Sequence, residues 1–146
     1  MTHTISPMSI NDYDEVLALW QHTDGVGLDL DDADSRENIN LYLQRNPGMS
    51  FIARAGSQLI GAVLCGHDGR RGFLHHLAVD PAFRKQGLGH LLVEHCLGAL
   101  RNCGITRCYI MVFADNAAGQ CFWNNAGWHA REDLLLMQAV TKDNLH

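Results

Sequence analysis

The sequence predicts a mixed α/β fold, an α+β arrangement in which one central sheet of six to seven strands is flanked by about four helices. The length of 146 residues suits a single hydrophobic core, so residues 1–146 are expected to form one domain. An apolar content of 47% is typical of a folded globular chain. The apolar patterns run in a definite order: helices, several antiparallel strands, one strand–helix–strand crossover, and a final helix followed by strands.

The N-terminal third is expected to hold one short strand and two helices. Residues 3–6 form the strand. Ser9 and Asp12 resemble a capping box and open the first helix. The segment 24–34 is rich in aspartate and glycine and is therefore expected to be a loop. The second helix is predicted over residues 36–45.

The middle of the chain is expected to supply most of the sheet. Strands are predicted over residues 50–55 and 58–65, joined by a tight turn, and over residues 73–79. A helix over 88–103 is indicated by apolar residues spaced three and four apart. The next strand is predicted over 106–113. A helix of this length allows a right-handed crossover, which makes the strands on either side parallel.

The last part is expected to close the fold. A fourth helix is predicted over residues 117–125, with Gly127 after its end. Residues 128–140 are expected to supply one or two closing strands. The tail 141–146 is expected to fray.

Composition excludes several classes of protein. A net charge of −5 argues against nonspecific nucleic-acid binding. No apolar run is long enough for a membrane span, and the N-terminus lacks the features of a secretory signal, so a cytoplasmic location is expected. The five cysteines form no C-x-x-C pair. They predict neither a metal site nor a disulfide framework, and are expected to be small buried residues.

The stretch between the strand 73–79 and the following helix has the features of an anion site. Gly87 and Gly89 lack a Cβ and let a ligand approach the main chain. The first turn of a helix offers unpaired N–H groups and a positive dipole end. Arg84 and Lys85 add positive charge. The pattern is neither a Walker loop nor a dinucleotide fingerprint, and it also occurs at ordinary strand-to-helix connections.

Two motifs resemble the GNAT superfamily of N-acetyltransferases. Arg84-Lys85-Gln86-Gly87-Leu88-Gly89 resembles the [RQ]-x-x-G-x-[GA] acyl-CoA loop of that family. Residues 116–128 resemble its N-x-x-A-x-x-[FL]-Y-x-x-x-G-F segment. The resemblance covers residues 50–130 by sequence and the first fifty only by element order. It implies a GNAT-like sheet with one parallel β-α-β crossover.

The resemblance also implies a donor, acetyl-CoA, held in a gap where the two parallel strands splay apart. Its pantetheine is expected on main-chain groups near Leu77 and Val79, and its diphosphate on the loop amides. Asn116 is expected to bind the cofactor arm or the substrate, and Trp123 either lines the gap or belongs to the core. The cofactor-binding residues implied are Leu77, Val79, Arg84, Lys85, Gln86, Gly87, Leu88, Gly89, His90, Asn116 and Trp123.

Amine acetylation requires a neutral amine, whereas an alkyl amine with a pKa of about 10.4 is mostly protonated at neutral pH. Two positions depart from the family. Trp123 stands where many members have a tyrosine acid, and Met111 stands where the ribosomal-protein N-acetyltransferases have a glutamate. His75 and His76 are the candidate bases. Strand alternation directs only one of them into the gap. His75 is preferred because it matches a catalytic histidine of arylalkylamine N-acetyltransferases; His76, or neither, is the alternative.

The acceptor side is expected near the acidic loop. A rim including Asp29 would favour a cationic amine, and Trp20 is a candidate for lining the same pocket. A solvated loop and a helix-core tryptophan are the alternatives.

The function expected is acetyl-CoA-dependent N-acetyl transfer to a primary amine, either a small molecule or a protein N-terminus. The resemblance implies direct transfer of the acetyl group in a ternary complex. A homodimer is possible. No metal, nucleic acid or membrane partner is expected. One rival is a catalytically weak acyl-CoA-binding sensor or interaction module. Another is a nucleotide-phosphate binder that uses the same loop.

Overall fold

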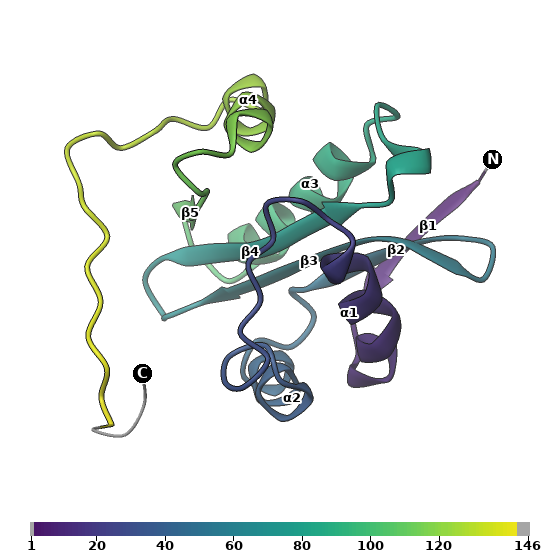
Figure 1. The fold of residues 1–146 in the computed structure, drawn as a ribbon, viewed down its shortest axis with the longest axis horizontal. Coiled ribbons are helices and arrows are strands. Elements are labelled where there is room, and N and C mark those ends of the chain that lie inside the picture. Colours follow the sequence, from purple (N-terminus) through teal and green to yellow (C-terminus); the bar gives the residue numbers. More distant parts are fainter. Residues whose placement is uncertain (1, 143–146) are drawn as a thin grey trace.

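The computed structural model describes residues 2–142 and is built on one five-stranded sheet in the order β1-β2-β3-β4-β5 (Figure 1). β1 to β4 pair antiparallel with their neighbours, while β4 and β5 are parallel. The predicted crossover is therefore confirmed. The strands are β1 (His3–Pro7), β2 (Phe51–Ala55), β3 (Gln58–His67), β4 (Gly72–Val79) and β5 (Cys108–Ile110).

The four helices predicted from the sequence are confirmed. Asp12 accepts a hydrogen bond from the Ser9 amide (2.9 Å) at the start of the first helical segment. Ser35 accepts one from the Asn38 amide (3.2 Å) and caps the second helix. The helices are α1 (Tyr13–Gln21), α2 (Arg36–Arg45), α3 (Leu88–Asn102) and α4 (Ala117–Asn125), with 3-10 turns η1 (Ile10–Asp12) and η2 (Pro81–Phe83).

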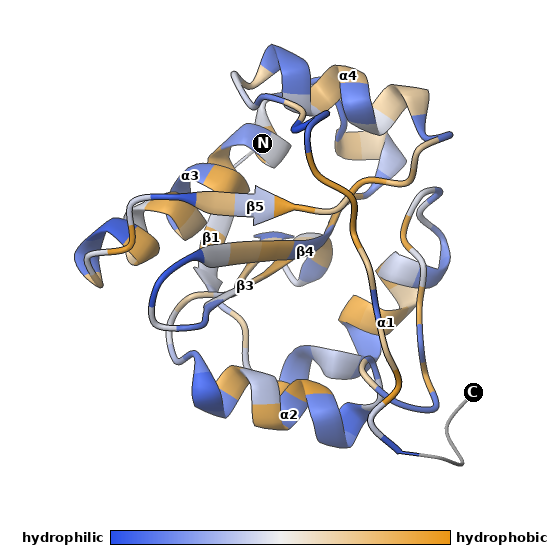
Figure 2. Ribbon diagram, turned by 90° about the vertical axis from the view of Figure 1, so that its left-hand side faces the viewer, coloured by the Kyte–Doolittle hydropathy of each residue, from blue (hydrophilic) through white to orange (hydrophobic). Residues whose placement is uncertain are grey.

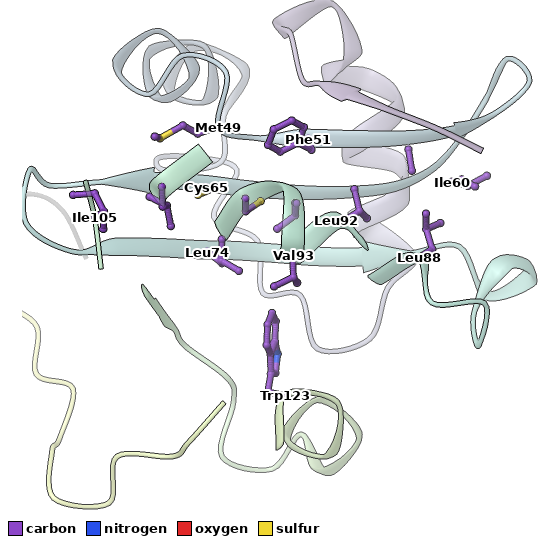
Figure 3. Close-up of a cluster of buried hydrophobic side chains, with 14 residues drawn as sticks. Met49, Phe51, Ile60, Cys65, Leu74, Leu88, Leu92, Val93, Ile105 and Trp123 are labelled. Carbon is purple, nitrogen blue, oxygen red and sulfur yellow. The ribbon is translucent and has the colours of Figure 1, made fainter. Parts of the chain in front are cut away.

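The helices cover both faces of the sheet, with α3 on one side and α1 and α2 on the other (Figure 2). On the α3 side, Leu92 and Cys96 pack with Phe51, Cys65 and Leu74 from the strands. Figure 3 shows this cluster, including side chains of the sheet and of α3. The alternation of strand residues accounts for the two faces, because neighbouring side chains point to opposite sides.

The second core lies beneath α1 and α2. Val16 and Trp20 of α1 and Ile39 of α2 pack there against Ile52 and Leu64 of the sheet. All five side chains are at least 97% buried. Burying such side chains contributes roughly 1.5–3 kcal/mol each, so this core fixes α1 against β3 and β4.

The sheet has five strands in the described residues, and the prediction of six to seven was wrong. A strand was expected over 106–113, but β5 spans only three residues, because its partner β4 diverges after the pair Leu74–Ile110. Residues 128–140, expected to supply closing strands, form none, and every residue from 129 to 142 is exposed. Of the tail expected to fray, 143–146 lie outside the described residues.

The cysteines only partly match the expectation that they are buried. Cys65 and Cys96 are buried and Cys108 is half-buried, whereas Cys103 and Cys121 are exposed. Among residues 2–142 no three His, Cys, Asp or Glu side chains form a group that could hold a metal ion. No helix in the same range has the length and apolar character required to cross a membrane.

Candidate active site

The site begins where the two parallel strands separate. Pairing between β4 and β5 covers Gly72 to Leu74 on one strand and Cys108 to Ile110 on the other. β4 then continues to Val79 with a partner, β3, on one edge only within the described chain. Peptide groups on the other edge of this stretch therefore lack a ladder partner. Except for the Val79 carbonyl oxygen, which accepts a hydrogen bond from the Arg84 side chain, they are available to pair with a bound molecule.

The loop after β4 is held in a defined conformation. The Asp80 carboxylate accepts a hydrogen bond from the Ala82 amide (2.9 Å) and starts η2. Lys85 has a φ of +63° and Gly87 a φ of +80°. The left-handed conformation costs a non-glycine residue roughly 1–2 kcal/mol, so Lys85 is strained. Gly87 has nothing within 4 Å of where a Cβ would lie.

The amide groups of this loop are free to bind an anion. None of the backbone N–H groups of residues 85–90 donates to another protein group among the described residues, and Arg84, Lys85, Gln86, Gly87 and His90 are exposed. The 15-residue helix α3 adds the positive end of its dipole. These donors and positive charges are what a bound diphosphate requires, and its binding at this loop stays a prediction.

Arg84 links the loop to the strand before it. Its Nε donates to the Val79 carbonyl oxygen (2.9 Å), while its side chain remains exposed. Leu77 and Val79 are half-buried and pack toward the α3 side of the sheet. The end of β4 and the charged loop are thereby held together.

α4 packs on the first turn of α3. The Phe122 ring stacks on the exposed His90 ring with centroids 4.7 Å apart. A Cβ on Gly89 would lie 3.1 Å from the same Phe122 ring, so a larger residue would require that ring to shift by a few tenths of an ångström. Leu88 is only 2% exposed and belongs to the core. Gly89 thus allows close packing of the two helices.

Trp123 lies in the core cluster and is 8% exposed. It extends from α4 toward Val93 and the other core side chains (Figure 3), and its ring packs edge-on against Trp128 at 4.8 Å. Of the two roles left open for this tryptophan, packing is the one that these contacts support; a cofactor contact stays a prediction.

A β-bulge in β4 changes the direction of the two histidines. Two residues of β4, His76 and Leu77, lie opposite the single residue Val63 of β3. His76 has a φ of +56°, and such an extra residue is the definition of a bulge. His75 and His76 consequently face the same side, with ring centroids 6.3 Å apart. The prediction that alternation would separate them was wrong for this reason.

His76 is held by groups from two other elements. Its Nε2 lies 2.9 Å from Oδ1 of Asp34, and the Trp20 indole donates to its carbonyl oxygen (3.0 Å). The Tyr13 hydroxyl donates to the Asp34 carbonyl oxygen (2.6 Å). Burial acts to raise the pKa of Asp34, but hydrogen bonds from His76 and from the Asp29 amide outweigh it, so this pKa is lowered. The carboxylate is therefore charged at neutral pH.

His75 is the first residue beyond the last paired position of β4 and β5. Its ring packs edge-on against Tyr42 of α2, with centroids 6.2 Å apart. Burial, with a smaller effect of His76, lowers the pKa of His75. The ring is therefore neutral at neutral pH, and no protein group among residues 2–142 forms a hydrogen bond with its nitrogens. A neutral imidazole with free nitrogens is able to accept a proton.

The loop after α1, which includes Gly25 and Gly27, packs against the segment before α4. A Cβ on Gly25 would lie 2.5 Å from Nδ2 of Asn116, and one on Gly27 would lie 2.7 Å from Cζ of Phe113. Only glycine fits these close approaches without displacement. A pocket of about 320 Å³ lies at this contact, lined by Asp24, Gly25, Val26, Phe113, Asp115 and Asn116.

The remaining predicted site residues occupy different environments. Asn116 caps α4 by accepting from the Gly119 amide (2.9 Å) and lies at this pocket. The Asp29 side chain is exposed. Trp20 is 1% exposed, so it has almost no surface for a substrate and instead supports His76. Met111 is 56% exposed.

The sequence did not single out Asp34. It was one of five aspartates in a segment expected to be a loop, and only its position directly before the capping Ser35 distinguished it. Its contact with His76 joins residues 42 positions apart. No local pattern encodes such a contact.

Comparison with known proteins gives the family. The model of the acetyltransferase (GNAT) family matches residues 14–128. An acetyltransferase of Yersinia enterocolitica, YE1169, is 28% identical over 133 residues, which cover 91% of this chain and 92% of that protein. The chain therefore belongs to the GNAT family and is an acetyltransferase. The donor used by this family is acetyl-CoA.

Solved structures show the same fold. An acetyltransferase from Streptococcus agalactiae superposes with a TM-score of 0.78 at 19% identity, covering 97% of this chain and 92% of that one. The PaiA N-acetyltransferase of Thermoplasma acidophilum, solved in complex with coenzyme A, has a TM-score of 0.75 at 19% identity, with 86% and 88% covered.

Proposed function

We propose that this acetyltransferase moves the acetyl group of acetyl-CoA to a primary amine by direct transfer in a ternary complex. The observation that carries the proposal is the combination of free loop amides at the start of α3 with a neutral histidine beside the unpaired end of β4. Each part supplies one requirement of the reaction: the amides hold the donor, and the histidine accepts the amine proton.

The loop residues would hold the donor by its phosphates. The amides of residues 86–90 have no protein acceptor among the described residues and would donate to the phosphates, and Arg84 and Lys85 add positive charge in a protein whose net charge is −5. Main-chain groups of Leu77 and Val79 would pair with the pantetheine. When bound, acetyl-CoA supplies a thioester carbonyl, and the Val79 amide would stabilise the negative charge that develops on its oxygen.

His75 would act as the base, directly or through a water molecule. Its free nitrogens accept the proton of the attacking amine, and that proton is then available to the departing thiol. His76 is the alternative base. One of its nitrogens is engaged by Asp34, which fixes the ring and leaves the other nitrogen for a substrate.

The acceptor would be a small-molecule amine or a protein N-terminus. The pocket beside Asn116 has two carboxylates, Asp24 and Asp115, among its lining residues, and Asp29 is exposed nearby in sequence. Negative charge at this rim favours a cationic acceptor. A cytoplasmic location, where acetyl-CoA is made and used, remains part of this proposal.

The test is release of free thiol from acetyl-CoA across a panel of primary amines and short peptides. An acetyltransferase of this kind releases thiol in proportion to acetylated product for at least one acceptor. If the protein binds coenzyme A but releases no thiol with any of these acceptors, it is the acyl-CoA sensor of the rival hypothesis. Trp123 and Met111 favour that hypothesis, because they stand where other family members have a tyrosine acid and a glutamate.

Donor binding is tested separately by titration calorimetry with coenzyme A. Arg84→Glu should weaken coenzyme A binding roughly tenfold or more. A tenfold change in Kd corresponds to about 1.4 kcal/mol of binding free energy, which the loss of one charge-assisted contact to phosphate can account for. Arg45→Glu is the matched control, since Arg45 is also exposed but lies at the end of α2. Equal affinities in the two variants would refute the loop assignment.

A further inference from the structure

Two arginines stand side by side where the parallel strands β4 and β5 begin. Gly72 pairs with Cys108 in the ladder, and the Gly72 amide donates to the Arg107 carbonyl oxygen (2.9 Å). Arg71 and Arg107 directly precede these two paired residues, so they are neighbours across the two strands. Like charges opposite each other in a sheet are destabilising. The fold therefore concentrates positive charge at this end of the sheet.

The two guanidinium groups converge on the hydroxyl of Tyr109. Arg107 and Arg71 both lie within hydrogen-bonding reach of its oxygen, and their charge lowers the pKa of Tyr109. The Tyr109 ring packs against Phe73 with centroids 5.8 Å apart. The Arg71 guanidinium also donates to the Arg70 carbonyl oxygen (3.2 Å). These contacts hold the two guanidinium groups and the hydroxyl at one point.

No carboxylate neutralises these two arginines. Neither Arg71 nor Arg107 takes part in an ion pair within residues 2–142. Asp68 is the acidic residue of the same turn, but its Oδ1 accepts the backbone amides of Arg70 and Arg71 (both 2.8 Å). Its carboxylate is thus engaged in holding the turn.

Arg131 and Asp133 add no net charge to this cluster. The Arg131 guanidinium lies close enough to Tyr109 for their charges to interact, but it donates to both carboxylate oxygens of Asp133 at 2.8 Å. Glu132 lies between them in sequence; it is exposed and forms no ion pair in the described part of the chain. The uncompensated charges beside Tyr109 are therefore those of the two arginines at the strand starts.

The cluster offers the donors that an oxyanion requires. A guanidinium has five N–H donors in a planar fork, which matches the oxygens of a carboxylate or a phosphate. Because the arginines approach the oxygen of Tyr109, its hydroxyl hydrogen remains available to donate to a further group. Arg107 is exposed, and Arg71 and Tyr109 are half-buried. A ligand can therefore reach the cluster from solvent.

The cluster is separate from the loop proposed to hold coenzyme A. β4 begins directly after Arg71 and ends at Val79, before that loop, and its eight residues span roughly 25 Å. Figure 1 shows the turn between β3 and β4 at one end of the sheet and the loop before α3 at the other. An anion bound at the cluster would leave the loop amides free.

The cluster lies on the same face of the sheet as His75. Leu74 packs in the α3-side core, so Phe73 and His75, its neighbours in β4, point to the opposite face. The contact of the His75 ring with α2 agrees with this direction. Arg71 precedes His75 by four residues, which corresponds to roughly 13 Å along the strand. One extended small molecule can span that distance.

We propose that Arg71, Arg107 and the Tyr109 hydroxyl bind the carboxylate or phosphate group of a small molecule. The two guanidinium groups donate to its oxygens, and the hydroxyl adds a third donor. The group belongs either to a free anion or to the amine acceptor itself, whose amino group would then lie near His75. Only the second source rests on the proposed function.

The first experiment titrates the protein with inorganic phosphate and follows the Nε–Hε signals of its arginines by heteronuclear NMR. Chloride at the same ionic strength is the reference. The signals of Arg71 and Arg107 should shift with phosphate and reach saturation. Arg71→Gln and Arg107→Gln should each weaken phosphate binding roughly tenfold, because one charge-assisted contact is lost. Tyr109→Phe keeps the ring and should weaken it less.

Arg70→Gln is the matched control, because Arg70 is exposed in the same turn but is not among the groups at the Tyr109 hydroxyl. Its affinity for phosphate should change little, and circular dichroism checks that each variant is folded. Shifts no larger with phosphate than with chloride would overturn the proposal. An equal loss of affinity in Arg70→Gln would also overturn it, because it would reveal a diffuse positive field and no defined site.

The second experiment identifies the source of the group. It compares the acetylation of two peptides of about four residues, which span roughly 13 Å when extended and differ only in ending with a carboxylate or a carboxamide. If the acceptor supplies the group, kcat/KM is higher for the carboxylate, and Arg107→Gln brings the two values together. Equal values beside saturable phosphate binding identify a free anion as the ligand. If neither peptide is acetylated, the proposed function fails for these acceptors, whereas the phosphate titration still decides whether the site exists.

Discussion

At the scale of single residues, His75 and His76 lie on one face of the sheet, but their surroundings give the two imidazoles different properties. His76 is fixed through Asp34 and Trp20. His75 is partly enclosed near Tyr42 and keeps its nitrogens free of protein partners in the described chain. A base must be neutral and reachable, which favours His75, whereas His76 is the better oriented of the two.

The pH dependence of catalysis distinguishes these histidines. If His75 is the base, kcat/KM of the unaltered enzyme falls as the pH drops through the pKa of His75, which burial lowers from its ordinary value of 6.5. His75→Gln should reduce kcat/KM by about 10²–10⁴-fold at pH values above that pKa and remove this limb of the profile. His76→Gln serves as the comparison. An unchanged profile in His75→Gln would reject the assignment.

Asp34 is predicted to stabilise the fold through its ionised form. Asp34→Asn should lower the free energy of unfolding by about 1–3 kcal/mol at pH 7, the range for a buried polar contact that loses its partner. The pKa of Asp34 is lowered by folding. Its contribution is therefore full above the unfolded value of about 3.9 and is lost as the pH falls through the folded value.

Urea unfolding at a series of pH values from neutral to acidic measures this effect. The difference between Asp34→Asn and the unaltered chain should shrink below about pH 4. Asp31→Asn is the control, because Asp31 is exposed in the same loop; it should change little. A difference for Asp34→Asn that stays constant down to acidic pH would contradict the role given to the carboxylate.

At the scale of elements, the sequence predicted the helices better than the strands. The capping residues Ser9, Ser35 and Asn116 mark helix starts through local hydrogen bonds, and local signals are readable in a sequence. The length of β5 depends instead on where β4 diverges from it. The bulge at His76 is equally invisible, because an extra residue in a strand leaves the apolar pattern almost unchanged.

The conformation of the loop before α3 gives a prediction at this scale. Gly87→Ala should destabilise the left-handed backbone at φ +80° by about 1 kcal/mol. In the variant without ligand, the loop would leave this conformation. Restoring the conformation on binding would cost the same free energy and so weaken coenzyme A binding roughly fivefold. Calorimetry measures the affinity and chemical unfolding measures the stability.

The control for this variant is Gly69→Ala. Gly69 has a φ of +94° and open space around its Cβ position, as Gly87 has, but it lies in the turn between β3 and β4. The two variants should lose similar stability, and only Gly87→Ala should lose affinity. Equal affinity in both would mean that the loop conformation does not matter for binding.

At the scale of the whole molecule, donor binding should stabilise the fold. Coenzyme A at about a hundred times its Kd adds about 2.7 kcal/mol to the free energy of unfolding, which corresponds to a rise in Tm of roughly 5–10 °C for a domain of this size. Differential scanning fluorimetry measures the shift. ATP at the same concentration should produce a much smaller one, and equal shifts would favour the nucleotide-binding rival.

The sequence also predicted a sheet flanked by helices and the position of the loop between β4 and α3. It did not predict how the acidic segment 24–34 folds over the site. That segment is placed by Gly25 against Asn116 and by Asp34 against His76, contacts between distant parts of the chain. One or two closing strands were predicted over residues 128–140, but the structure forms none there, because an apolar pattern alone does not supply a neighbouring strand with which to pair.

The tight fit of Gly25 and Gly27 against Asn116 and Phe113 has a consequence for turnover. The segment before α2 and the segment before α4 therefore border the pocket together. If the proposed amine acceptor binds in this pocket, an amine wider than the pocket has to separate the two segments, and so does its acetylated product. Under that proposal, shortening Phe113 should broaden the range of accepted amines and speed product release, whereas a side chain at Gly27 should push the two segments apart.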